Sequence, residues 1–401
     1  MSLLLLPPQS LTLLLLVVTR GTCAFLSQTR VMYVCSSSTS SSSGCGGRAT
    51  PAVGYQSVVA DSQCLRLPSV AGADPQRCNE LLLLAAAGLR EQENPRSSLG
   101  EKEKPGTSTE AAPQHHVLYF PGDVQNYREI MARHPENFQW ESWSLENIAF
   151  LLAHHFTNSY IWVVKSSRMH LHKFSCYDNF VKSNMFGAPD HSIEFGAFKH
   201  LYSLLVNAFA LTQKIVLSKK KQHGLRREAK TSSYCRANSS HTSNGCQGER
   251  ERKYEQYDDA TTNFNPPSFK DASFTLIGFS KGCVVLNQLL FELREAQKDK
   301  NINTFIKNIR TMYWLDGGHS GGSNTWVTYP EVLQEFAKTG IAVHTHVTPY
   351  QVNDPMRSWI GKEHKKFVQI LEDFGVQVTN QIHFEKEPPS IENHFRVHEV
   401  F

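Results

Sequence analysis

The sequence predicts an α/β fold, with a doubly wound and mostly parallel sheet of about six strands covered by helices on both faces. From His115 onward, short apolar and β-branched runs alternate with segments whose apolar residues recur at helical spacing. Strands that alternate with helices of this length form parallel sheets buried on both faces. The pentapeptide Gly278-Phe279-Ser280-Lys281-Gly282 lies between one such strand and one such helix. With 40% hydrophobic residues among 401, the chain has ample material for one core.

The six predicted strands are short runs rich in β-branched and aromatic residues, which suits strands buried in a sheet. They cover residues 117–120, 160–164, 274–277, 311–315, 341–347 and 376–384. The helices between them are predicted from apolar residues spaced three or four positions apart. These residues are Leu145, Ile148, Leu152 and Phe156; Phe198, Leu201, Tyr202, Leu205 and Phe209; Leu286, Leu289, Leu290 and Leu293; and Ile360, Phe367, Ile370, Leu371 and Phe374. A further helix is predicted to end at Gly340.

Residues 1–60 are predicted to be a leader that directs the chain to its compartment. They contain no Asp or Glu, three arginines and a serine-rich run at 36–43, which is typical of a mitochondrial transit peptide. The apolar run 11–18, followed by Thr22-Cys23-Ala24, also resembles a secretory signal, so secretion is the alternative. Prolines before this run and an arginine after it leave too few apolar residues for a membrane span.

The rest of the chain divides by composition into a linker and a folded domain. Residues 61–113 mix Ser, Gly, Pro and charge, so they are predicted to be a low-order linker with one short helix within 79–90. The α/β domain is predicted over 114–401, with a polar insertion at about 212–270. Between Lys214 and Arg236 this insertion has eight basic residues and a single acid. It is expected to be solvated and disordered; the alternative is a docking patch for an acidic protein partner or an anionic membrane surface.

Charge and cysteine usage exclude several classes of function. A net charge of only +4 gives no global field for nucleic acid. The nine cysteines show no zinc-finger spacing, and an odd number argues against a disulfide framework, so a reducing compartment is favoured. His170 with His172, and His344 with His346, each share one face of an extended segment, but neither pair has a third ligand at recognisable spacing. We therefore expect no metal site, and the serine chemistry described below requires neither a metal nor an organic cofactor.

Ser280 is the candidate nucleophile. The apolar strand 274–277 precedes it, a leucine-rich helix follows it, and glycines lie two positions to either side. Strand, Gly-x-Ser-x-Gly and helix together are the context of a nucleophile elbow, in which a sharp turn holds the serine Oγ above a parallel sheet. The alternative is a plain glycine-rich turn between strand and helix.

Two aspartates are candidates for the acid of a catalytic triad. In α/β-hydrolase folds the order along the chain is serine, acid, histidine, each at the carboxyl end of a strand. Asp316 directly follows the strand after Ser280, whereas Asp354 follows the next strand. The later position is the usual one, so the sequence favours Asp354. The alternatives are that Asp354 caps the helix behind it and that Asp316 steadies the glycines after it.

The candidate base is a histidine beyond the last predicted strand. His394 is favoured because the loop 385–393 is long enough to return over the serine. His398 is the alternative, and it is expected to be at the surface. A serine hydroxyl needs such an imidazole to take its proton, and the imidazole needs a carboxylate to orient it.

The oxyanion formed on attack requires backbone N–H donors. Lys281, the residue after the serine, is expected to supply one donor, and the loop at Gly122 after the first strand is expected to supply the other. The ammonium of Lys281 either favours an anionic substrate or points into solvent. Cys283 lies in the first turn of the following helix, and we expect it to be buried against the sheet.

Residues 115–401 resemble the mitochondrial family named after human chromosome 2 open reading frame 69. The resemblance depends on the segments 115–123, 174–187, 274–290, 313–328 and 391–401. It implies an α/β-hydrolase fold similar to serine esterases, a mitochondrial and matrix location, and support of respiratory-chain function. It also implies that Ser280 is the serine of the elbow.

The sequence thus predicts a mitochondrial serine hydrolase acting on a small-molecule acyl substrate, a carboxylic ester or thioester, through an acyl-enzyme. The alternative is a catalytically inactive scaffold of the same fold that binds a mitochondrial protein partner, because a fold does not guarantee its chemistry.

Overall fold

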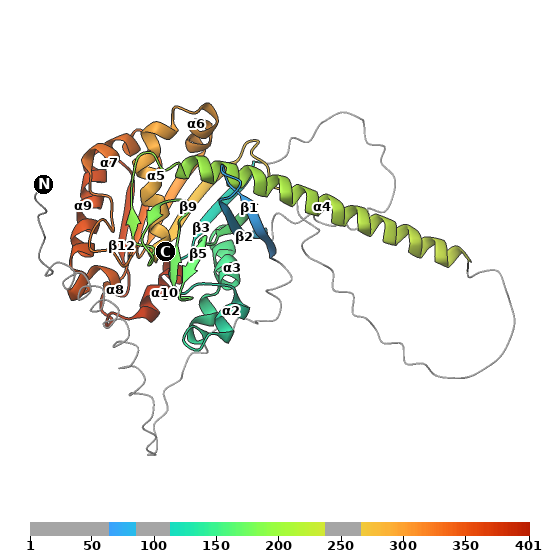
Figure 1. The fold of residues 1–401 in the computed structure, drawn as a ribbon, viewed down its shortest axis with the longest axis horizontal. Coiled ribbons are helices and arrows are strands. Elements are labelled where there is room, and N and C mark those ends of the chain that lie inside the picture. Colours follow the sequence, from blue (N-terminus) through green and yellow to red (C-terminus); the bar gives the residue numbers. More distant parts are fainter. Residues whose placement is uncertain (1–63, 86–112, 237–265) are drawn as a thin grey trace, which may run out of the picture. The chain divides into compact units, whose positions relative to one another are not determined.

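Eight strands form the central sheet in the computed structural model, which describes residues 64–85, 113–236 and 266–401 (Figure 1). Their spatial order is β1-β2-β4-β3-β9-β10-β11-β12. They are β1 (Leu65–Ala71), β2 (Cys78–Ala85), β3 (His115–Phe120), β4 (Ser159–Val164), β9 (Ser273–Phe279), β10 (Ile309–Leu315), β11 (Ala342–Val347) and β12 (Val378–Ile382). The predicted leader, residues 1–60, lies outside the described residues.

The predicted fold class is confirmed, because all six predicted strands are present and pair in parallel as β3, β4 and β9 to β12. Their carboxyl ends therefore meet at one edge of the sheet, called the carboxyl edge below. β3 lies between β4 and β9, so the chain winds first to one side of β3 and then to the other. Ligand sites of open α/β sheets lie at the carboxyl edge beside such a switch point.

Two further strands, β1 and β2, differ from the predicted linker and its short helix. β2 pairs antiparallel with β4, placing Leu81 opposite Val164, and β1 pairs antiparallel with β2. The run from Leu81 to Leu84 is buried on both faces of the sheet. A strand buried on both faces has a continuous apolar sequence, which cannot be distinguished from a buried helix by periodicity alone.

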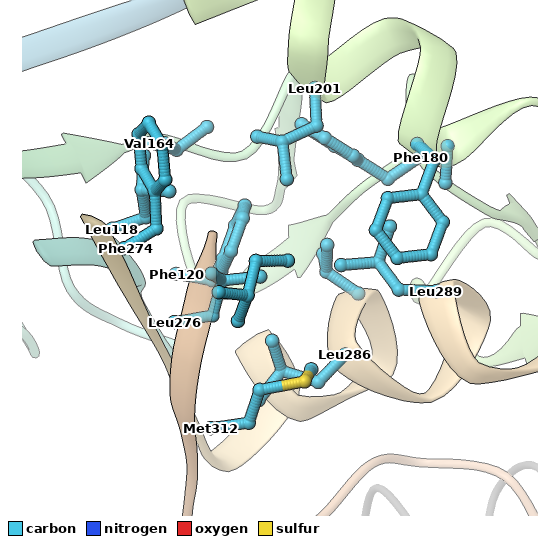
Figure 2. Packing of buried hydrophobic residues seen from close by; sticks show 14 of the residues in the cluster. Leu118, Phe120, Val164, Phe180, Leu201, Phe274, Leu276, Leu286, Leu289 and Met312 are labelled. Carbon is cyan, nitrogen blue, oxygen red and sulfur yellow. The ribbon is translucent and has the colours of Figure 1, made fainter. Parts of the chain in front are cut away.

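Helices cover both faces of the sheet and bury two apolar clusters. One face carries α4 (Ala197–Arg236), α5 (Cys283–Ala296), α6 (Lys300–Lys307), α7 (Pro330–Ala337) and α9 (Trp359–Asp373). The other carries α2 (Arg128–Arg133), the 3-10 helix η2 (Phe138–Trp143), α3 (Leu145–His155) and α10 (Ile391–Val400). Figure 2 shows part of the first cluster, which includes Leu118 and Leu276 of the sheet and Leu286 of α5.

The helix α4 extends into the predicted insertion. It runs from Ala197 to Arg236, so the first part of the 212–270 segment is helical, while residues 237–265 lie outside the described part. Its portion Ala197–Lys219 is long and apolar enough for a membrane span by length and composition. Because Leu201, Leu205 and Phe209 of this portion are buried in the first cluster, we describe it as a core helix.

Short elements at the carboxyl edge complete the fold. Between β4 and α4 lie two small antiparallel sheets, β5 (Arg168–His170) with β6 (Phe174–Cys176), and β7 (Lys182–Ser183) with β8 (Pro189–Asp190). The turn η4 (Ser280–Gly282) follows β9, and α8 (Pro349–Val352) and η5 (Pro355–Arg357) follow β11.

Buried histidines are expected to make the fold sensitive to mild acid. Burial lowers the pKa of His116 and His398 to about 3 and that of His346 and His364 to about 4. The unfolded chain takes up protons at these residues below pH about 6.5, whereas the folded protein does not, so the free energy of unfolding falls as pH decreases. Each residue should cost about 2 kcal/mol at pH 5. Urea unfolding at pH 7.5 and pH 5 measures this loss; equal stability at both would contradict it.

Candidate active site

Ser280 lies in a strained turn at the carboxyl end of β9. Its φ is 50°, in the left-handed region that non-glycine residues rarely adopt, and α5 begins three residues later. The glycines around it are required by close packing. A Cβ at Gly278 would lie 2.8 Å from Cys283 Cα, and one at Gly282 would lie 1.9 Å from the carbonyl oxygen of Phe120. Strand, strained serine and helix therefore have the geometry of a nucleophile elbow.

Gly282→Ala is expected to lower the free energy of unfolding by about 4 kcal/mol or more, because the added Cβ would meet backbone atoms that cannot rotate away. Gly322→Ala is the matched control, since nothing lies within 4 Å of a Cβ at that position. Urea unfolding of both variants measures the difference. A Gly282→Ala protein as stable as the Gly322→Ala protein would contradict the close packing of the turn.

An aspartate and a histidine meet at the carboxyl edge. His394 Nδ1, in the first turn of α10, lies 2.6 Å from Oδ2 of Asp316, which directly follows β10. Thr348 donates to both oxygens of this carboxylate, from its amide at 2.7 Å and from its hydroxyl at 2.6 Å. Asp316 is fully buried and His394 is 5% exposed. The Nδ1–H donated to Asp316 leaves Nε2 of His394 as the nitrogen able to take a proton.

Ser280 lies next to this pair in the fold. The ring of Phe279, its neighbour in the chain, packs against the ring of His394 with centroids 4.6 Å apart. Within the described part of the chain the Ser280 hydroxyl forms no hydrogen bond. Catalytic hydrogen bonds are often long in ligand-free proteins and shorten when substrate binds.

Asp354, the acid favoured from the sequence, lies elsewhere. Its carboxylate accepts a hydrogen bond from the amide of Met356 at 2.8 Å and one from Nε of Arg357 at 2.7 Å. It therefore caps η5, which is the alternative that the Asp-Pro sequence allowed. The structure brings Asp316 to His394 instead, because α10 places His394 beside the residue that follows β10, while the carboxylate of Asp354 is turned toward Met356 and Arg357.

His398, the alternative base, is not at the surface. It is fully buried, its Nδ1 donates to the carbonyl of Phe395 at 2.6 Å, and its Nε2 lies 3.0 Å from the hydroxyl of Tyr119. Both ring nitrogens are therefore engaged away from Ser280. His398 comes four residues after His394, so it extends the same helical face into the core.

Of the two predicted oxyanion residues, Gly122 has its amide engaged. It donates to Oε1 of Gln125 at 2.8 Å. The predicted close approach is present, since a Cβ at Gly122 would lie 2.9 Å from Cβ of Ser280. In the described part of the loop after β3, the amide of Asp123 donates no hydrogen bond. Asp123, which the sequence analysis did not single out, thus has the available N–H in this loop.

The side chain of Lys281 neither points into solvent nor remains free for an anionic substrate. It is fully buried, and its Nζ donates to the carbonyl of Phe186 at 2.9 Å and lies 3.6 Å from Oδ2 of Asp123. Burial raises the pKa of Asp123, and the Lys281 ammonium opposes that rise. This pair joins the elbow to the loop after β3.

Two residues after β11 complete the surroundings of His394. Thr348 holds Asp316 as described, and the ring of Tyr350 packs on His394 with centroids 4.9 Å apart. Burial raises the pKa of Tyr350 to about 12. The segment was recognised in the sequence only as the location of Asp354.

Cys283 is buried as expected, and burial raises its thiol pKa well above the usual value. The described residues contain no group of three or more His, Cys, Asp or Glu able to hold a metal.

Comparison with known proteins shows the family. A family model described as C2orf69 matches residues 66–377 of the chain. The chain belongs to the C2orf69 family. It is 73% identical over 341 residues to human "Mitochondrial protein C2orf69", covering 84% of this chain and 86% of that protein. It is 43% identical over 339 residues to the zebrafish C2orf69 homologue, covering 84% and 85%. The predicted resemblance is thereby confirmed.

Two solved esterase structures are similar to this C2orf69 chain at low identity. A thermostable esterase matches with a TM-score of 0.37 and 11% identity, covering 85% of this chain and 61% of that chain. Brefeldin A esterase matches with a TM-score of 0.33 and 9% identity, covering 86% and 75%. Because these TM-scores are low, the fold assignment depends on the strand order and the elbow described above.

Proposed function

We propose that this C2orf69 protein is a serine hydrolase that cleaves a carboxylic ester or thioester through an acyl-enzyme. The contact between Asp316 and His394, formed at the same edge of the sheet as the strained Ser280, carries the proposal. These three residues lie far apart in the sequence, so their convergence at one edge of the sheet is informative.

In the proposed reaction Ser280 Oγ attacks the acyl carbon while Nε2 of His394 takes the hydroxyl proton. The tetrahedral intermediate then breaks its bond to the leaving alcohol or thiol, which receives that proton from His394. Water attacks the acyl-enzyme by the same route and releases the acid. Asp316 remains ionised and stabilises the imidazolium, while Thr348 holds the carboxylate in place.

The oxyanion is proposed to be stabilised by the amides of Lys281 and Asp123. Lys281 N–H follows the nucleophile, as elbows require, and Asp123 N–H is the available donor in the loop after β3. The Asp123–Lys281 contact would hold the two amide donors in position relative to each other. No metal or organic cofactor enters this scheme.

The location is proposed to be mitochondrial, and more specifically the matrix, with a supporting role in respiratory-chain function. Relatives in human, mouse and zebrafish are named mitochondrial proteins. Residues 1–60 have the composition of a transit peptide and would direct the import.

A non-catalytic scaffold is the second candidate, and the burial of Ser280 favours it. Ser280 is only 6% exposed, and its hydroxyl forms no hydrogen bond in the described part of the chain. In this case the basic residues between Lys214 and Arg236 would bind an acidic mitochondrial protein or an anionic membrane surface.

A fluorophosphonate probe separates the two candidates, because it phosphonylates an activated serine and leaves other hydroxyl groups unmodified. The full-length purified protein is incubated with the probe, and the label is located by mass spectrometry of the proteolytic peptides. We expect the label on Ser280. A folded protein that takes up no label would favour the scaffold.

A further inference from the structure

Strongly exposed apolar side chains concentrate at the carboxyl edge. Six large apolar side chains of the described residues are more than half exposed: Phe138, Leu171, Met185, Ile193, Leu217 and Met356. Leu171, Met185 and Ile193 lie between β4 and α4, Phe138 lies in η2 between β3 and α3, and Met356 lies in η5 between β11 and α9, so all except Leu217 lie between a parallel strand and the long helix that leads to the next one. Scattered exposed apolar residues need no explanation, but their concentration on one side indicates a binding surface.

Leu171 is exposed in a backbone conformation that is unfavourable for leucine. It lies at the tip of the β5–β6 hairpin, in a turn closed by a hydrogen bond from the amide of Lys173 to the carbonyl of His170. Both central residues, Leu171 and His172, have a φ of 53°. Turns with two positive φ values strongly prefer asparagine and glycine. A leucine that is 63% exposed in such a turn is therefore unfavourable for folding, and such strain often marks a functional site.

This hairpin is bonded directly to the loop beside Ser280. The amide of Val124 donates to the carbonyl of Lys173 at 2.7 Å, and the amide of Ser175 donates to Asp123 Oδ1 at 2.8 Å. The hydroxyl of Ser175 donates to the carbonyl of Gly122 at 2.8 Å. The tip carrying Leu171 and the loop carrying the available Asp123 amide therefore belong to one hydrogen-bonded unit.

Met185 is joined to the same unit from its other side. Its carbonyl accepts a hydrogen bond from Arg168 of β5 at 3.1 Å, and the carbonyl of the next residue, Phe186, accepts from Lys281. The ring of Phe186 packs on that of Phe174 with centroids 5.6 Å apart. Lys281 of the elbow is therefore hydrogen-bonded to the segment that carries Met185, and the Phe174–Phe186 contact joins that segment to the hairpin that carries Leu171. The ammonium of Lys281 is buried and paired with Asp123, so it offers little to an anionic group.

We infer that the site accepts an ester or thioester of a long-chain fatty acid, whose alkyl chain extends from Ser280 over Phe186 toward Leu171 and Met185. The chemistry of this inference rests on the proposed function, whereas the binding of the chain does not. Each buried methylene strengthens binding by about fourfold. The acyl chain comes either from a soluble acyl ester or thioester or from a lipid in a bilayer, and both sources present the same aliphatic group.

Chain binding is measured on full-length protein carrying Ser280→Ala, so that no turnover occurs. The probe is a fluorescent long-chain fatty acid, displaced by unlabelled octanoate or palmitate. We expect palmitate to compete at least tenfold better than octanoate. Leu171→Asn and Met185→Ser should each weaken binding of the probe several-fold. Asparagine suits a positive φ, so the Leu171→Asn fold should be at least as stable as the parent.

Phe374→Ser is the matched control, because Phe374 is also exposed but follows α9 at the opposite edge of the sheet. It should leave binding unchanged. Equal competition by octanoate and palmitate, or undiminished binding in both hairpin variants, would overturn the inference.

Turnover by the unsubstituted protein tests the chemistry separately. p-Nitrophenyl esters of two to sixteen carbons are compared in solution and in phosphatidylcholine vesicles. Hydrolysis that rises with chain length supports the inference, and preference for one medium identifies the source of the chain. Hydrolysis that does not depend on chain length would contradict the proposed binding site for the alkyl chain but would support the proposed hydrolase activity. Binding of the alkyl chain without any hydrolysis would support the binding site but contradict the proposed hydrolase activity.

Discussion

Ser280→Ala is expected to abolish labelling by a fluorophosphonate and to lower ester hydrolysis on the order of 10⁶-fold. Without Oγ no acyl-enzyme forms, and any residual rate would come from bound water near the oxyanion donors. The fold should change little, because alanine at this position keeps the same backbone and the same strain at φ 50°. Labelling of purified protein by gel fluorescence, with the melting temperature as a check on folding, measures the effect.

A second serine provides the control for this result. Ser320 lies in the glycine-rich loop after Asp316, is exposed, and has its Oγ 3.5 Å from the carbonyl of Phe186. Ser320→Ala should label at the rate of the unsubstituted protein. If Ser280→Ala protein were still labelled at that rate, the elbow would not contain the nucleophile.

Asp316→Asn is expected to slow fluorophosphonate labelling and ester hydrolysis about 10⁴-fold, whereas Asp354→Asn should change them by less than threefold. The amide at position 316 would no longer hold the Nδ1–H tautomer of His394 or stabilise its imidazolium. Asp354 instead caps η5 and contacts Arg357, and a partly exposed pair of this kind contributes little. Initial labelling rates for both variants at pH 8 give the comparison.

The two substitutions are closely matched, since each replaces a carboxylate by an amide of the same shape in a segment that follows a parallel strand. Both proteins should retain the melting temperature of a folded domain. If Asp354→Asn slowed labelling and Asp316→Asn did not, the assignment would be reversed, and Asp354, which the sequence favours, would be the acid of the triad.

The parts of the site that could be predicted from the sequence are those encoded locally. The elbow was predictable because strand, Gly-x-Ser-x-Gly and helix are contiguous between Ser273 and Ala296. The choice between Asp316 and Asp354 was not, because both follow parallel strands and only the packing of α10 determines which one meets His394. Nothing in the chain order carries that information.

Other differences between prediction and structure arise because the predictions used the average behaviour of a residue type, from which individual residues depart. Lysines are rarely fully buried, so a lysine after the nucleophile was expected to reach solvent or substrate, whereas Lys281 is enclosed by the Phe186 carbonyl and Asp123. His398 was expected at the surface because it is near the end of the sequence, yet its helix packs into the second cluster. The strands β1 and β2 were missed because β1 pairs with β2, and the next partner of β2 in the sheet, β4, lies about eighty residues further along the chain.

The position of α10 also sets the order in which the site is assembled during synthesis. Ser280 leaves the ribosome well before Asp316, and His394 follows only with the helix Ile391–Val400. The sheet and the turn that holds Ser280 are therefore synthesised before His394, the imidazole proposed to activate the hydroxyl. A chain terminated between β12 and Ile391 would contain every strand of the sheet but would lack the imidazole of His394.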